Sequence, residues 1–70
     1  MYKVDTNRLC GKIVERGFNQ QSFAGELGIS RETLRGYIRD YRKIPYKVLT
    51  RMVEVLGCDY SEAKDIFFAS

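Results

Sequence analysis

Two arginines, Arg31 and Arg35, have the most distinctive spacing in the chain, within the segment GISRETLRG (residues 28–36). On a helix, residues four apart share one face, so both guanidinium groups would point the same way. Like charges at this spacing repel each other slightly, so local helix stability does not account for the pair. A guanidinium group only donates hydrogen bonds, and it suits a negatively charged or oxygen-rich partner. The spacing therefore indicates a surface that binds such a partner.

Catalytic chemistry has little support in the composition. Histidine is absent, no CxxC motif occurs, and the two cysteines, Cys10 and Cys58, each lie in an apolar stretch near a leucine. We expect both cysteines to be small buried hydrophobic residues rather than parts of a disulfide, a zinc site or a nucleophile. Clustered carboxylates and a glycine-rich phosphate loop are missing too. We therefore expect a protein that is not an enzyme and that needs no metal, cofactor or small-molecule ligand.

The length and the polarity of the chain set further limits. Seventy residues suffice for one domain with a small core, because a chain of this size buries only about 60% of its unfolded surface. Hydrophobic residues make up 44% of the sequence and charged residues 30%, which is typical of a globular protein. No apolar run approaches the roughly 20 residues that cross a membrane, and the N-terminal stretch has no apolar signal core. We expect a cytoplasmic protein without a membrane partner.

Positive charge is concentrated in one segment. The formal net charge is +3, yet residues 31–47 alone carry +4, while residues 1–30 carry +1 and residues 48–70 carry −2. A localised basic segment is typical of a protein that binds nucleic acid, although a merely solvated surface would have the same composition. The basic residues of this segment are Arg31, Arg35, Arg39, Arg42, Lys43 and Lys47.

The spacing of the apolar residues predicts an all-α protein, a compact bundle of about five short helices without strands. We expect helices at about residues 7–16, 20–27, 31–39 and 45–56, and a last short one after Asp59. The residues expected to begin or end them are Asn19, Ser30, Pro45 and Asp59 at the starts and Gly17, Gly28 and Gly57 at the ends. The expected inward-facing residues are Leu9, Cys10, Ile13, Val14, Phe23, Ala24, Leu27, Val48, Leu49, Met52, Val53, Leu56, Ala63, Ile66 and Phe67.

Only three residues, 28–30, separate the second and third helices, and a glycine-containing turn this short is typical of a helix-turn-helix. The helix at 31–39 would have one basic face and one largely apolar face. Gly36 lies on the basic face, where it costs an isolated helix about 1 kcal/mol relative to alanine but permits close approach to another surface. The basic face comprises Arg31, Glu32, Arg35, Gly36 and Arg39, and the other face comprises Thr33, Leu34, Tyr37 and Ile38.

A basic helix of this kind fits the major groove of DNA, which is about 12 Å wide and admits one α-helix. Arg31 and Arg35 would then contact base edges, and Glu32 would either accept a hydrogen bond from cytosine or simply suit the helix dipole. Tyr41 would either contact phosphate or pack on the fourth helix. The residues that we expect to contact phosphates are Gln20, Gln21, Ser30, Arg39, Tyr41, Arg42 and Lys43.

The segment GFNQQSFAGELGISRETLRGYIRDYRKIP (residues 17–45) resembles the helix-turn-helix of the Cro and phage-repressor type, the XRE family. The likeness continues through PYKVLTRMVEVLGCDYSEA (residues 45–63), so it covers nearly the whole chain. It implies a lambda-repressor-like DNA-binding fold, with residues 1–70 as a single domain and the helix-turn-helix at about 20–39. The matching residues are Gly17, Phe18, Gln20, Phe23, Ala24, Leu27, Gly28, Ile29, Ser30, Thr33 and Leu34.

The resemblance also implies a function: a transcriptional regulator, most similar to a small Cro-like phage repressor, that binds a palindromic operator as a homodimer. Its expected partner is double-stranded DNA, which would place it on the nucleoid. Asp40 departs from the family, which usually has glycine there, so the chain is expected to leave the third helix differently, with a carboxylate facing phosphate unfavourably. The positions that match the base-contacting residues of the family are Arg31, Glu32, Arg35 and Gly36, and those that match its backbone-contacting residues are Gln20 and Arg42.

A second interpretation is a protein–protein interaction module, such as an antirepressor that binds a partner repressor. It rests on the C-terminal stretch DIFFAS, where Phe67 and Phe68 cannot both face inward on one helix. An exposed phenylalanine there would equally form the seam of a homodimer, which is the interpretation that we favour.

Overall fold

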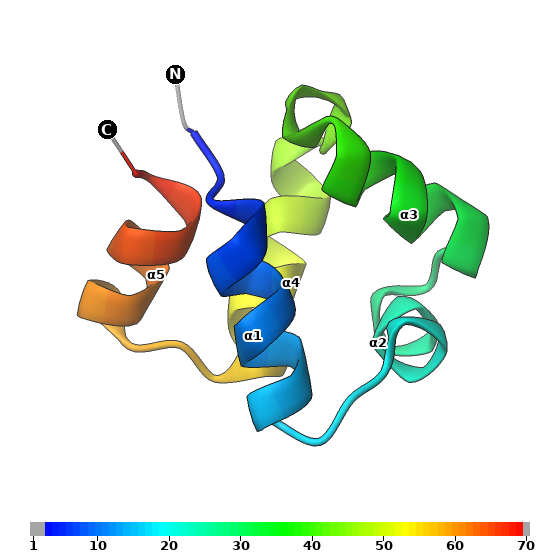
Figure 1. Cartoon of the computed structure of the whole chain (residues 1–70), viewed down its shortest axis with the longest axis horizontal. Helices are drawn as coiled ribbons and strands as arrows, with labels where there is room; N and C mark the ends of the chain where they lie inside the picture. The colour runs from blue at the N-terminus through cyan, green and yellow to red at the C-terminus, as the bar shows by residue number, and fades with distance from the viewer. Residues whose placement is uncertain (1–2, 70) are drawn as a thin grey trace.

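The computed structural model describes residues 3–69, and within that range it contains five α-helices, one short 3₁₀ helix and no strand (Figure 1). The helices are α1 (Thr6–Glu15), α2 (Gln20–Leu27), α3 (Arg31–Arg39), η1 (Tyr41–Lys43), α4 (Tyr46–Leu56) and α5 (Tyr60–Phe67). The predicted all-α fold is therefore confirmed, and each predicted α-helix begins within about one residue of its expected position. The first four also end within about one residue of it, whereas no end was predicted for α5. The 3₁₀ helix η1 was not predicted.

Side-chain caps explain where most of the helices begin. Asn19 accepts a hydrogen bond from the backbone N–H of Ser22 (2.8 Å), and Ser30 accepts one from that of Thr33 (3.1 Å). Asp59 does the same for α5, and Asp5, which was not predicted as a cap, does so for α1. Each such cap stabilises a helix by about 1 kcal/mol. Helix α4 has no side-chain cap, since Pro45 lies just before its first residue.

The turn between α2 and α3 depends on Gly28, whose φ of 73° lies in the left-handed region. A residue with a Cβ atom is strained in that conformation, whereas glycine is not. Gly28 ends α2, and Ser30, two residues later, caps α3. The chain thus changes direction within three residues, and α3 packs against α2.

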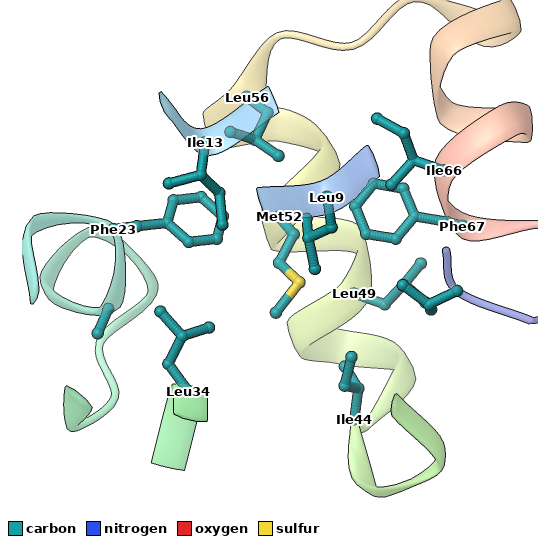
Figure 2. Packing of buried hydrophobic residues seen from close by; sticks show 12 residues of the cluster. Leu9, Ile13, Phe23, Leu34, Ile44, Leu49, Met52, Leu56, Ile66 and Phe67 are labelled. Carbon is teal, nitrogen blue, oxygen red and sulfur yellow. The ribbon is translucent and has the colours of Figure 1, made fainter. Parts of the chain in front are cut away.

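The core is built from all five α-helices. Helix α2 packs against α3 and α4, and α1 packs against α5. Figure 2 shows Met52 of α4 near the centre of the cluster, with Leu9 of α1 and Phe67 of α5 close to it. The fully or nearly fully buried apolar residues are Val4, Leu9, Ile13, Phe23, Ala24, Leu34, Ile44, Leu49, Met52, Leu56, Ile66 and Phe67.

Helix α1 corrects one prediction. Val14, expected to face inward, is 71% exposed, while the charged Lys12 is only 5% exposed. The buried stripe of α1 is centred on Leu9 and Ile13, and at about 100° per residue Lys12 lies within that stripe and Val14 outside it. The ammonium of Lys12 donates a hydrogen bond to Glu62 of α5, and this contact joins the two helices.

The two ends of the described chain lie side by side. The backbone N–H of Asp5 donates to the carbonyl of Ile66 (2.7 Å), and that of Ala69 donates to the carbonyl of Lys3 (2.9 Å). Val4, between them, is buried in the core. These contacts hold α5 against the start of the chain.

Candidate nucleic-acid interface

Helix α3 is held in place through one face. Leu34 is fully buried, and Tyr37 and Ile38 are partly buried and pack against the same core. Thr33, predicted on this apolar face, is exposed instead, and its hydroxyl shares a hydrogen bond with that of Ser30 (2.8 Å). The face by which α3 packs against the core is thus narrower than predicted, and it depends mainly on Leu34.

The opposite face of α3 is basic and exposed. Arg31, Arg35 and Arg39 are all exposed, and because α3 is continuous from 31 to 39 they lie on one side of it. Among the described residues, none of the three has an ion pair with a carboxylate. Glu32 is exposed on the same side, and Gly36 is half-buried. The positive charges of the guanidinium groups on this face are therefore not paired with carboxylates of the described chain.

The start of α2 lies next to the start of α3. A hollow is lined by Asn19, the N-cap of α2, by Gln20 and Gln21 from its first turn, and by Arg31 from α3. Amide donors, a guanidinium group and the positive ends of helices are the groups that favour an anion. Two predicted phosphate contacts, Gln20 and Gln21, are thus brought beside the predicted base-contacting Arg31.

The helix η1 follows α3 and carries the next basic residues, Arg42 and Lys43, both exposed. Asp40 caps η1 by accepting a hydrogen bond from the backbone N–H of Arg42 (3.2 Å), and its carboxylate also contacts the Arg42 guanidinium. Hydrogen bonding to this guanidinium holds the pKa of the Asp40 carboxyl below its ordinary value. Tyr41 is half-buried, and its side chain packs against the core.

The far side of the molecule carries an apolar patch on α5. Phe67 is fully buried, so we correct its assignment as a candidate seam residue and place it in the core. Phe68 is 45% exposed and Tyr60 is 84% exposed, and together with Ala63 and Lys64 they line a hollow. Tyr60 was missed from the sequence, although its position eight residues before Phe68 puts both near one face of α5.

Groups that would support other kinds of site are few in the part of the chain that the structure describes. No three histidine, cysteine, aspartate or glutamate side chains there are placed to hold a metal ion. Its helices are too short or too polar to pass through a bilayer. Both cysteines are free and half-buried, and burial raises the pKa of the Cys58 thiol, which favours its protonated form.

These features define a class of protein. Two short helices joined by a tight glycine-containing turn, the second with an exposed basic face, form a helix-turn-helix. The helix-turn-helix family model matches residues 12–62, which is more than half of the chain. The chain therefore belongs to the helix-turn-helix family of XRE (Cro/C1) type and is a DNA-binding regulator, in a family that is not one of enzymes. No curated protein and no solved structure matches it.

Proposed function

We propose that the protein represses transcription by binding a palindromic operator with α3 in the major groove, as a small Cro-like phage regulator would. The observation that supports this most is that Arg31 and Arg35 lie one turn apart and are both exposed on α3, while Leu34 of the same helix is buried in the core. In helix-turn-helix proteins the second helix enters the major groove with its N-terminal residues at the base edges. The described residues would act as one domain.

In this proposal, residues in the first half of α3 contact the bases. Arg31 and Arg35 would each donate paired hydrogen bonds to O6 and N7 of a guanine, and Glu32 would accept one from N4 of a cytosine. Because the three side chains are exposed on one helical face, they can enter the groove together.

Gly36 would contribute through its missing side chain. The φ of Gly36 is not positive, and no atom outside the local helix backbone lies within 4 Å of where a Cβ would stand. The fold therefore does not require glycine at this position, although glycine weakens a helix. A close approach of the α3 backbone to the bases would explain why position 36 is a glycine.

Contacts to the DNA backbone would flank the base contacts on both sides. One phosphate would bind in the hollow that the start of α2 forms with Arg31. A second phosphate would contact η1, which follows the C-terminal end of α3. Ser30 would take part while its hydroxyl also caps α3. The proposed phosphate-contacting residues are Gln20, Gln21, Ser30, Arg39, Tyr41, Arg42 and Lys43.

We propose that two copies associate through the apolar patch on α5, at least on DNA. In a two-fold interface the same patch occurs on both subunits, so Tyr60 and Phe68 of each copy would cover those of the other. Such a dimer would bind half-sites about 34 Å apart, one helical turn of DNA. The same exposed patch favours one other function, an antirepressor that docks on a partner repressor without binding an operator.

Selection of bound duplexes from a random pool tests the proposal directly. We expect an enriched palindrome with half-sites one turn apart. Affinity for that sequence should fall steeply as salt rises, because phosphate contacts release counterions. A pool that shows no enrichment, together with binding that does not change with salt, would contradict operator binding and would favour the antirepressor.

A further inference from the structure

Asp40 and Arg42 form an ion pair where α3 passes into η1. The Oδ1 atom of Asp40 accepts from Nε of Arg42 at 3.0 Å and from the backbone N–H of Arg42 at 3.2 Å. The Oδ2 atom accepts from Nη2 at 3.4 Å. The carboxylate thus contacts one edge of the guanidinium group with both of its oxygens.

This pair sets Arg42 apart from the arginines of α3. Arg31, Arg35 and Arg39 have no carboxylate partner among the described residues, whereas Arg42 has one that is only two residues away. The pKa of Arg42 is raised, first by its hydrogen bond with Asp40, and that of Asp40 is lowered, so both groups are charged at neutral pH. The net charge of the pair is zero, although Arg42 belongs to the basic segment.

We propose that the Asp40 carboxylate competes with a DNA phosphate for the Arg42 guanidinium. This competition weakens binding of the protein to the DNA backbone. This inference rests on the proposed function, in which Arg42 contacts a phosphate. If Arg42 stays with Asp40, it neutralises the phosphate only in part and fewer counterions are released. If Arg42 turns to the phosphate, the Asp40 carboxylate is left unpaired near a second negative charge. Both routes cost affinity.

The fold itself gains little from the charge of Asp40. An exposed ion pair contributes little to the free energy of folding. The cap of η1 needs only a side-chain oxygen at this position, and asparagine provides one. Asp40→Asn therefore removes the competing charge while it keeps the acceptor for the Arg42 backbone N–H.

Titration of a labelled duplex of mixed sequence over a series of salt concentrations measures the effect. For Asp40→Asn we expect binding about two- to fivefold tighter than wild type at low salt. We also expect the slope of log affinity against log salt to steepen by up to about 0.9, the value for one more neutralised phosphate. Glu26→Gln, on an exposed part of α2, changes the net charge equally and serves as the matched control.

Combining the change with Arg42→Ala separates competition for Arg42 from simple repulsion of DNA. If Asp40 acts through Arg42, Asp40→Asn should strengthen binding more when Arg42 is present than when it is alanine. Equal gains in the two backgrounds, or a gain in wild type no larger than that of Glu26→Gln, would overturn the inference and leave operator binding intact. A wild-type protein that binds no duplex at all would instead overturn the proposed function and the inference together.

Discussion

Individual arginines on the basic surface have different electrostatic surroundings. Arg31 is exposed at the first position of α3, where no described carboxylate pairs with it, and Arg42 is exposed on η1 but paired with Asp40. Arg31 is also placed beside the start of α2, whereas Arg42 lies beyond the other end of α3. Equal formal charge therefore does not imply equal contributions to DNA binding.

We predict that Arg31→Ala costs about 1–3 kcal/mol of binding free energy on the selected operator and relaxes the choice of base at one position. Arg42→Ala should weaken binding to all duplexes by a similar factor and should lower the salt slope by at most about one. Competition assays with the operator and with scrambled duplexes measure both. Equal losses on every sequence from the two variants would show that Arg31 does not contact bases.

Gly36 offers a second test at the scale of one residue. Gly36→Ala should stabilise α3 by about 0.5–1 kcal/mol, because alanine is the better helix former and the added Cβ meets no neighbouring side chain. The same variant should bind the operator more weakly, since the methyl group separates the helix from the bases. Gly11→Ala is the matched control, because Gly11 is an exposed glycine of α1 with equally open space around it.

Chemical denaturation and operator titration of both variants give the result. Gly11→Ala should raise stability and leave DNA binding unchanged. If Gly36→Ala behaved in the same way, the missing side chain would have no part in recognition.

The helices show which features a sequence can specify alone. The caps at Asn19, Ser30 and Asp59 and the left-handed Gly28 act within a few residues, so local rules predicted them correctly. The shared face of Arg31 and Arg35 follows from the helical repeat in the same way, and it supplied most of the candidate site.

Features that depend on contacts between distant elements were not predictable. Lys12 is buried because α5 brings Glu62 against it, and 50 residues separate the two in sequence. Phe67, in contrast, was predicted on the inner face of the last helix from the helical repeat, and it is buried there. The helix η1 could not be predicted from a hydrophobic repeat, because it has only three residues. Its cap, Asp40, was the one local feature that indicated a helix there.

The contact between α1 and α5 predicts a pH dependence of stability. Glu62 accepts from Lys12 and, as the third residue of α5, from the backbone N–H of Asp59 (3.2 Å). The hydrogen bond from Lys12 lowers the pKa of Glu62 from its ordinary 4.5, and the one to Glu62 raises the pKa of Lys12 from its ordinary 10.5. The charged Glu62 therefore stabilises the fold above pH 4.5, and this contribution is lost as the pH falls through its lower folded value. The contribution of Lys12 is complete below pH 10.5 and is lost as the pH rises above its higher folded value.

Urea denaturation of wild type and Glu62→Gln across the pH range checks this sign. Wild type should be the more stable protein near neutral pH, and the difference should shrink in acid as Glu62 is protonated. A stability difference of the same size at low pH would mean that the charge of Glu62 is not what joins α5 to α1. Glu54→Gln, an exposed change on α4, should show no such pH-dependent difference.

On the scale of the whole molecule, the two proposed binding surfaces lie far apart. In Figure 1, α3 and α5 occupy opposite sides of the view, with α1 between them. The sequence segments follow the same division, because residues 31–47 carry +4 and residues 48–70 carry −2. The apolar patch on α5 is therefore well placed to meet a second copy without blocking the basic face of α3.

We predict that the protein forms dimers through this patch and that Phe68→Glu weakens them, because like charges would face each other across a two-fold seam. Light scattering over a range of concentrations should show wild type shifting from monomer to dimer and the variant staying monomeric. The variant should lose affinity for the full palindrome but not for a single half-site. Val14→Glu, at an exposed apolar residue of α1, is the control and should leave the dimer intact.

The backbone hydrogen bonds between Lys3–Asp5 and Ile66–Ala69 have a practical consequence for protein engineering. A purification tag or fluorescent label joined at Lys3 or Ala69 would lie beside α5, so under the proposed function it would crowd the second copy sooner than the operator. The same proximity suits circular permutation: a short linker could connect Ala69 to Lys3, and the chain could be opened in the exposed turn at Gly17. Such a permutant would present α3 unchanged while moving both termini to another side of the protein.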